Sequence, residues 1–288
     1  MNRRTLLRNA LFGASAFVLY PLVSRASEGA AATLAELQRR HGGRLGVAVL
    51  DTGTGRRIAQ RGDERFLLCS TFKVLAVAAV LARVDAGREK LDRRIVFGPD
   101  VLLDYAPLTR RHVGAPGMTV ASLCEAAITL SDNTAANLML ASLGGPAAVT
   151  RFVRGLGDPV TRLDRTEPEL NHGGPGDIRD TSSPNAMLDT LQRLLLGNAL
   201  TGASRGLLLA WMRACTTGLD KLRAGVPTDW QAGDKTGSGA HGESNDVAIL
   251  WPRRRQPILV TAYYAGSSAD SSQRSAVLAA VGRIAASL

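Results

Sequence analysis

The chain has 288 residues, of which 45% are hydrophobic and 21% are charged. This composition is typical of one large folded domain, or of two lobes that share a core, and it excludes an intrinsically disordered chain. The formal net charge of +10 leaves a nucleic-acid-binding protein open as an alternative. Only four of the 35 basic residues are lysines, namely Lys73, Lys90, Lys221 and Lys235. Because lysine can lose its proton and arginine cannot, these lysines are candidates for chemistry that needs a titratable cation.

The first 26 residues have the pattern of an export signal. Three arginines within residues 3–8 precede 16 uncharged residues, 9–24, which is short of the roughly 20 that a membrane-spanning helix needs. Residues 24–26 suit signal cleavage, and residues 2–7 resemble a twin-arginine signal. We therefore predict a periplasmic protein exported by the twin-arginine route, with a retained membrane anchor as the alternative. Without the four arginines of this segment, 31 basic and 25 acidic residues remain, which weakens the nucleic-acid interpretation.

Hydrophobic periodicity predicts strands near both ends of the chain and helices between them. The expected elements are a helix at 30–40, a strand at 45–50 with a hairpin partner at 56–60, a buried helix at 71–86, helices at 120–130 and 137–143, strands at 247–251 and 258–264, and a helical stripe at 277–288. This order predicts an α/β fold: an antiparallel sheet flanked by terminal helices, plus an inserted all-α lobe. The α/β lobe would comprise about 27–61 and 214–288 and the all-α lobe about 62–213, with the site in the cleft between them.

The cysteines and histidines show no pattern of a metal site. Three cysteines, Cys69, Cys124 and Cys215, allow at most one disulfide, and we expect none to be required. The four histidines, His41, His112, His172 and His241, have no metal-ligand spacing. We therefore expect neither a metal nor a cofactor.

Ser70 and Lys73 lie three residues apart at the start of the predicted buried helix, so their side chains share one face. A serine hydroxyl becomes a good nucleophile when a neighbour removes its proton. Burial in an apolar helix lowers the pKa of a lysine, which suits it to that role. The alternative is a serine near a helix start beside a lysine that reaches the surface.

Two further short motifs have ordinary structural explanations when taken singly. Ser131, Asp132 and Asn133 form a cluster of the kind that caps a helix or makes a turn. Lys235-Thr236-Gly237 is compatible with a strand that ends in a glycine turn. Together with Ser70-Lys73, however, they occur in one order, at separations of 61 and 104 residues.

This triple resembles that of class A serine β-lactamases and penicillin-binding proteins. A fourth motif separates the two groups: residues 165–171, Arg-Thr-Glu-Pro-Glu-Leu-Asn, and the exit 177–181, Asp-Ile-Arg-Asp-Thr, resemble the Ω-loop of class A β-lactamases. The resemblance extends from about residue 30 to the C-terminus. It implies a monomeric enzyme whose partner is a small β-lactam substrate.

The resemblance implies a role for each motif residue. Ser70 would attack the lactam carbonyl, its proton passing to Lys73 or through water to Glu167, and backbone N–H groups of Ser70 and Ser238 would form the oxyanion hole. Glu167, with Asn171, would activate the water for deacylation. Ser131 would protonate the leaving nitrogen. The substrate would be bound by Tyr105 at the cleft mouth, Asn133, Lys235 and Thr236. The family also implies a cis Glu167–Pro168 bond and an Arg165–Asp180 ion pair.

Several positions depart from the pattern of many relatives. Relatives that place an arginine at the position of Ser244 or of Lys221 use it to bind the substrate carboxylate. Lys221 is therefore a candidate for that role here, and the alternative is that it is an ordinary surface lysine. Arg274 is a second candidate. Val77 excludes a disulfide to Cys124, and Gly239 excludes the one to Cys69 that carbapenem-hydrolysing relatives contain.

Two rival functions share most of these residues. A D,D-peptidase would use Ser70, Lys73, Ser131, Asn133 and Lys235 on peptidoglycan, but Glu167 with Asn171 argues against it. A penicillin sensor would be acylated without turnover, and would need a membrane-spanning region joined to a signalling domain.

Overall fold

The computed structural model describes residues 20–174 and 176–288, so most of the predicted export signal, residues 1–19, lies outside the described residues. The helices are α1 (Tyr20–His41), α2 (Phe72–Asp85), α3 (Val120–Thr129), α4 (Asn133–Leu143), α5 (Pro146–Gly155), α6 (Pro184–Leu195), α7 (Gly202–Arg213) and α8 (Ser271–Ala286). The strands are β1 (Arg44–Asp51), β2 (Arg57–Gln60), β3 (Phe66–Leu67), β4 (Arg94–Ile95), β5 (Met118–Thr119), β6 (Thr181–Ser182), β7 (Gln231–Ser238), β8 (Ser244–Trp251) and β9 (Ile258–Ala265).

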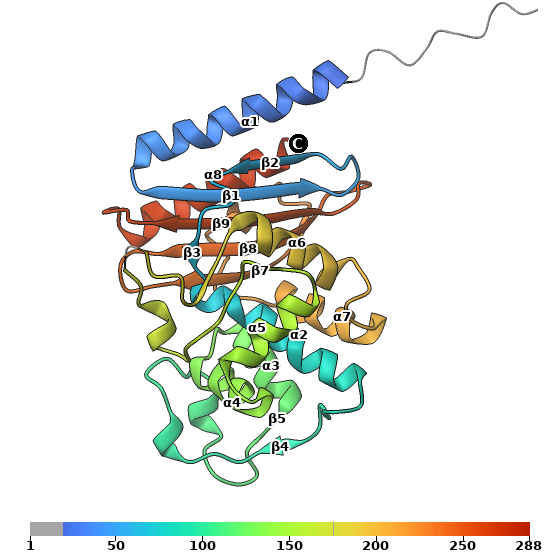
Figure 1. Cartoon of the computed structure of the whole chain (residues 1–288), viewed down its shortest axis with the longest axis vertical. Coiled ribbons are helices and arrows are strands. Elements are labelled where there is room, and N and C mark those ends of the chain that lie inside the picture. The colour runs from blue at the N-terminus through green and yellow to red at the C-terminus, as the bar shows by residue number, and fades with distance from the viewer. Residues whose placement is uncertain (1–19, 175) are drawn as a thin grey trace, which may run out of the picture.

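Five strands form one antiparallel sheet in the order β2-β1-β9-β8-β7. The first two strands come from the beginning of the chain and the other three from its end, so β1 pairs with β9 across about 200 residues, with Val47 opposite Ala262. This confirms the predicted fold class. The helical region inserted between the strands packs on the β7 side of the sheet, below it in Figure 1.

Alternating side chains of the sheet point into two separate hydrophobic cores, as the pleat of a strand requires. In β1, Val47 and Val49 pack with α1 and α8, whereas Ala48 and Leu50 belong to the core of the helical region. Helix α8 begins with a capping box, in which Asp270 and Gln273 satisfy each other's backbone N–H groups. The sheet is therefore covered on both faces, which explains why its central strands are almost wholly buried.

The inserted region surrounds α2, whose first ten residues, Phe72–Leu81, are all buried. A helix that is apolar on every side is stable only inside a core, and α3, α4, α5 and α7 pack against it. The region also contains two short ladders, β3–β6 and β4–β5, that the prediction of an all-α lobe did not include. Helix α6, from the same stretch of chain, packs on β1 and β9.

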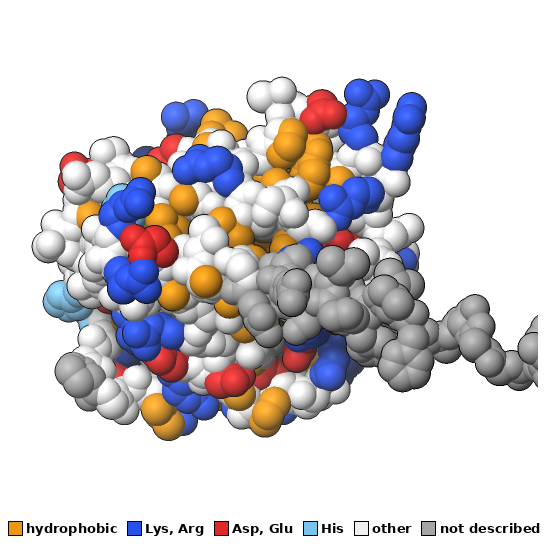
Figure 2. Space-filling model, turned by 90° about the horizontal axis from the view of Figure 1, so that it is seen from above, with side chains coloured by type: hydrophobic (Ala, Val, Ile, Leu, Met, Phe, Trp, Pro, Cys, Tyr) orange, Lys and Arg blue, Asp and Glu red, His pale blue; other side chains and the backbone are white. Residues whose placement is uncertain are grey.

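Two observations concern the nucleic-acid and membrane-anchor alternatives. On the face that Figure 2 shows, the described Lys and Arg side chains are interspersed with Asp and Glu and form no continuous basic patch. Among the described residues, no helix combines the length and the apolar character needed to cross a bilayer.

Candidate active site

A cavity of about 420 Å³ lies where the start of α2, the turn before α4, the 165–180 loop and the end of β7 meet. Nine of the eleven predicted site residues line it: Ser70, Tyr105, Ser131, Asn133, Glu167, Asn171, Lys221, Thr236 and Ser238. The other two, Lys73 and Lys235, are fully buried directly behind this lining. The fold thus brings together residues that are separated by up to 168 positions in the sequence.

Ser70 lies in the 3₁₀ turn Cys69–Thr71 that leads into α2, which begins one residue later than the predicted start at Thr71. Its hydroxyl accepts a hydrogen bond from Lys73 Nζ at 2.8 Å and donates one to Glu167 Oε1 at 3.1 Å. The residue before it, Cys69, has a φ of +44°, a conformation that is unfavourable for a side chain of this kind and that is often kept at functional sites. Ser70 Oγ therefore contacts both candidate bases at once.

Lys73 is fully buried, and its ammonium group is surrounded by acceptors. Nζ donates to the backbone oxygen of Ser131 at 2.9 Å and to Asn133 Oδ1 at 2.6 Å, and lies 3.0 Å from Glu167 Oε1. Burial is the largest influence and lowers the pKa of Lys73, although Glu167 acts in the opposite direction. This lysine can consequently give up a proton more readily than one in water.

The Ser131 turn inserts a second hydroxyl between two lysines. Ser131 adopts a φ of +59°, and its Oγ accepts from Lys235 Nζ at 3.0 Å and lies 3.4 Å from Lys73 Nζ. Asp132 instead stabilises the turn itself, because its buried carboxylate caps α4 through Ala135 N at 2.9 Å and accepts from Thr109 N. The capping interpretation of this motif is thus correct for Asp132, while Ser131 and Asn133 face the site.

Strand β7 forms the opposite wall of the cavity. Lys235 is fully buried, and this desolvation lowers its pKa to about 8. Thr236 shares a 2.6 Å hydrogen bond with Thr217. A Cβ placed on Gly237 would lie only 3.2 Å from the backbone nitrogen of Ser70, so glycine permits β7 to pass beside that amide. Ser238, the next residue, is the last of the strand and is exposed to the cavity.

Glu167 is buried on the 165–180 loop, which we call the Ω-loop, and its backbone is clamped by a residue that the sequence reasoning missed. Asn137, one turn along α4 from Asn133, donates to Glu167 O at 2.8 Å and accepts from Glu167 N at 2.9 Å. Asn171 Nδ2 donates to Glu167 Oε2 at 2.5 Å, and its buried Oδ1 has no hydrogen-bond partner among the described residues. The Glu167–Pro168 bond is cis, as the resemblance implied.

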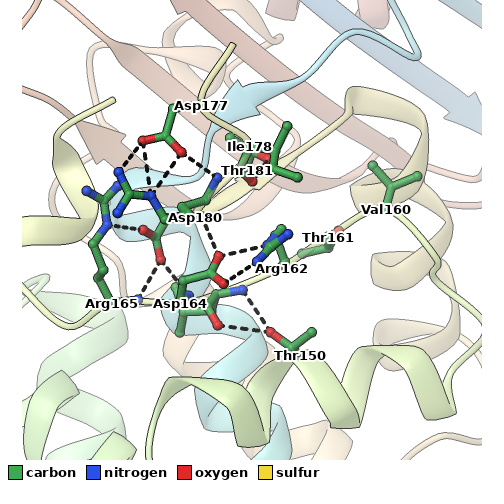
Figure 3. Close-up of polar contacts among 12 residues, drawn as sticks. Thr150, Val160, Thr161, Arg162, Asp164, Arg165, Asp177, Ile178, Asp180 and Thr181 are labelled. Carbon is green, nitrogen blue, oxygen red and sulfur yellow. Dashed lines mark hydrogen bonds and ion pairs between the residues drawn. The ribbon is translucent and has the colours of Figure 1, made fainter. Parts of the chain in front are cut away.

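The neck of the Ω-loop is closed by a polar network, drawn in Figure 3. Arg165 Nε donates to Asp180 Oδ2 at 2.6 Å, the expected ion pair, and the other Asp180 oxygen accepts from the backbone nitrogens of Asp164 and Arg165. Asp180 is fully buried, whereas Arg165 is 21% exposed. Asp164 adds a second pair, to Arg162. Both ends of the loop are thus held by charge-assisted hydrogen bonds.

The structure separates the two candidates for carboxylate binding. Lys221 is only 7% exposed, lines the cavity and donates from Nζ to Ser244 Oγ at 3.1 Å. Arg274 instead donates to the backbone oxygen of Ala269 and does not line the cavity. The position of Lys221 therefore contradicts the surface-lysine alternative.

Other features of the site concern its rim and its missed residues. Tyr105 is 51% exposed at the mouth, and all three cysteines are free and buried.

The cavity is also lined by Thr217, Asp220, Ser271 and Ser275, which sequence reasoning did not identify. Asn137 could have been found, because it lies four residues after Asn133 and so shares its helix face. Thr217 and Ser275 have no such local signal.

Comparisons with known proteins agree with this geometry. The family model described as "Beta-lactamase enzyme family" matches residues 29–288. A β-lactamase of Streptomyces albus G is 47% identical, with 99% of this chain and 96% of the relative covered. The β-lactamase CTX-M-25 of Escherichia coli is 44% identical, with 98% and 96% covered. A solved ancestral class A β-lactamase has a TM-score of 0.87 and 63% identity, with 88% of this chain and 98% of that one covered.

The chain belongs to the class A β-lactamase family. It is therefore an enzyme of that family, and the identification made from the four motifs is confirmed. Membership in class A also agrees with the loop that carries Glu167 and Asn171, the feature that argued against a D,D-peptidase.

Proposed function

We propose that this class A β-lactamase hydrolyses the β-lactam ring through an acyl-enzyme on Ser70, which water activated by Glu167 then cleaves. The observation that carries the proposal is the position of Ser70 Oγ, 2.8 Å from Lys73 Nζ and 3.1 Å from Glu167 Oε1. A nucleophile in hydrogen-bond contact with a base is the arrangement that nucleophilic catalysis needs. Here two candidate bases lie within hydrogen-bond distance of the nucleophile.

In acylation, Ser70 Oγ forms a bond to the lactam carbonyl carbon and loses its proton to Lys73 or to Glu167. The amide groups of Ser70 and Ser238 stabilise the negative charge that develops on the carbonyl oxygen, because β7 passes directly beside Ser70. The C–N bond of the ring then breaks. Ser131 Oγ, which lies between Lys73 and Lys235, delivers the proton to the departing nitrogen and is reprotonated from a lysine.

In deacylation, the Glu167 carboxylate removes a proton from a water molecule as that water attacks the ester on Ser70. The clamp from Asn137 fixes the Glu167 backbone, and Asn171 orients the carboxylate through Oε2. The free Oδ1 of Asn171 is positioned to accept a hydrogen bond from the same water or from the substrate. The proton returns to Ser70 Oγ as the ester bond breaks, which restores the enzyme.

The substrate carboxylate is bound on the β7 side of the cavity. Lys235 supplies positive charge from behind, Thr236 supplies a hydroxyl, and Lys221 supplies a second ammonium group beside Ser244. Asn133 and Tyr105 contact the rest of the substrate at the opposite edge. No group of three or more His, Cys, Asp or Glu suited to a metal occurs among the described residues, and the scheme above uses none.

Glu167→Ala tests the assignment of the deacylation base. We expect the variant to be acylated by a penicillin and to keep the adduct, seen by mass spectrometry as a persistent mass gain on the peptide that contains Ser70. Ser70→Ala is the control and should gain no mass. The unmodified enzyme should turn over a chromogenic cephalosporin many times. Rapid loss of the adduct from Glu167→Ala would show that another base drives deacylation.

The same experiment separates the rival functions. Stoichiometric acylation of the unmodified enzyme, without turnover, would indicate a penicillin sensor or a D,D-peptidase.

We further propose that the enzyme acts as a monomer in the periplasm after twin-arginine export. Replacing Arg3 and Arg4 by lysine should leave the protein in the cytoplasm, and N-terminal sequencing of the exported form should locate the cleavage near residue 26.

A further inference from the structure

Two histidines that lie 69 residues apart in the sequence face each other beside the cavity. His172 follows Asn171 in the Ω-loop, and His241 lies in the turn between β7 and β8. Their ring centroids are 6.5 Å apart, and the ring planes are inclined by 73°. No sequence spacing connects them, because the contact joins two separate segments, the Ω-loop and the β7–β8 turn.

The backbones of these two residues are anchored while their rings are free. His172 N donates to Glu169 O at 3.1 Å, and Arg165 donates to His172 O. His241 N donates to the buried carboxylate of Glu243 at 2.9 Å. Both side chains are exposed, and neither ring nitrogen has a hydrogen-bond partner in the described part of the chain. The two imidazoles are therefore held near each other and are available to a ligand.

Neutral imidazole nitrogen is a preferred ligand of Zn²⁺, Ni²⁺ and Cu²⁺. Metal–nitrogen bonds of about 2.0 Å at a tetrahedral ion place two ring centroids roughly 5–6 Å apart. The observed 6.5 Å needs only small rotations of two exposed side chains, which occur within nanoseconds. Among the described residues, no third His, Cys, Asp or Glu joins the pair to form a three-ligand cluster. Water would therefore fill the remaining coordination positions.

We propose that His172 and His241 bind one divalent transition-metal ion, which tethers the Ω-loop to the β7–β8 turn. The tether would join Asn171, which orients Glu167, to the strand end that carries Ser238. It would narrow that side of the cavity and restrain the loop on which deacylation depends. Binding is independent of the proposed function, whereas the effect of the metal on turnover rests on it.

The binding test uses the mature chain, free of any polyhistidine tag, titrated calorimetrically with NiCl₂ and with ZnCl₂. We expect one ion per chain, and an affinity that falls about tenfold or more in His172→Ala and in His241→Ala. His112→Ala removes an exposed histidine outside the pair and should bind as the unmodified chain does. Equal affinity in all four proteins, or no saturable binding at millimolar metal, would overturn the proposal.

The turnover test measures hydrolysis of a cephalosporin with a bulky acyl side chain at saturating metal. We expect a fall of about fivefold or more that EDTA reverses, in the unmodified chain and in His112→Ala but not in His172→Ala. Unchanged rates at saturating metal would refute the tether. An enzyme that shows no turnover even without metal would instead refute the proposed function, while the calorimetric result would still decide the metal site.

Discussion

The two sides of the active-site cavity are held in place by different forces. Lys73 and Lys235 lie on α2 and β7, and Ser70 lies in the 3₁₀ turn that leads into α2. The neighbours of these elements are buried apolar side chains of the main core. Glu167 and Asn171 lie on the Ω-loop, whose 3₁₀ turn Glu169–Asn171 contributes a single buried apolar residue, Leu170. In the proposed mechanism, the acylating groups are therefore positioned by packing, and the deacylating carboxylate by hydrogen bonds and ion pairs.

This difference implies that the two half-reactions can fail separately. A packed core distributes its stability over many small contacts, so one conservative change in it alters little. A buried polar network depends on each of its members, because removing one partner leaves the other unpaired away from water. Changes in the Ω-loop network should therefore slow deacylation while acylation continues.

The largest expected effect is that of Asp180→Asn. Asparagine tolerates the φ of +55° at this position, so the backbone can be kept while the charge is lost. Asp180 is fully buried and accepts three hydrogen bonds, and breaking such a pair costs about 3 kcal/mol. Urea denaturation should show this loss, and rapid-mixing experiments should show slower deacylation with little change in acylation.

Asp189→Asn is the matched control for that variant. Asp189 pairs with Arg57, but the side chains of both are more than 40% exposed. An exposed pair contributes about 0–1 kcal/mol because water and salt screen it. If both variants lost the same stability, or if Asp180→Asn slowed acylation and deacylation equally, the contrast between the two sides of the cavity would be wrong.

The same contrast explains which parts of the molecule could be predicted from sequence. The buried helix, the sheet and the two lysines on the packed side follow from periodicity and from motif spacing, since apolar runs and helix turns are local patterns. Helix spacing could place Asn137 on the same face as Asn133, but its bond to the Glu167 backbone and the choice of Asp132 as the helix cap required the structure. The same residue types serve as caps, turns and ligands alike.

Contacts between distant segments account for what sequence reasoning missed. Lys221 could be a surface charge or a ligand until the fold placed it against Ser244. The pairing of His172 with His241 has no local signature at all, since it depends on how the Ω-loop and the β7–β8 turn approach each other. Periodicity reports the environment of a residue and not its partners.

Lys221→Ala tests the carboxylate subsite and should have a smaller effect. Loss of one ammonium group from the cavity wall should raise KM for penicillins about tenfold, with a smaller change in kcat, because the interaction is made in substrate and transition state alike. Lys221→Arg should restore most of the affinity. Lys90→Ala, which removes the exposed lysine outside the site, should leave the kinetics unchanged. An unaltered KM in Lys221→Ala would show that the amine does not contact substrate.

The smallest expected effect is a pH dependence that arises on the packed side alone. Burial lowers the pKa of Lys235 to about 8, so its positive charge is complete only well below that pH and is lost as the pH rises through it. The Ω-loop pairs use arginine, which stays protonated throughout this range. The value of kcat/KM for a carboxylate-bearing substrate should therefore fall by about fivefold between pH 8 and pH 9.

Two controls assign that fall to Lys235. Lys235→Arg keeps its charge, so its kcat/KM, even if lower overall, should stay level across this range. A cephalosporin ester lacks the carboxylate, so its KM in the unmodified enzyme should not rise across this pH range. Burial lowers the pKa of Lys73 as well, but proton loss from Lys73 would alter kcat for the acid and the ester alike. If kcat/KM fell equally for the acid and the ester, the titrating group would not be the lysine that binds the substrate carboxylate. The pH-sensitive step would then lie in the chemistry of acylation and not in substrate binding.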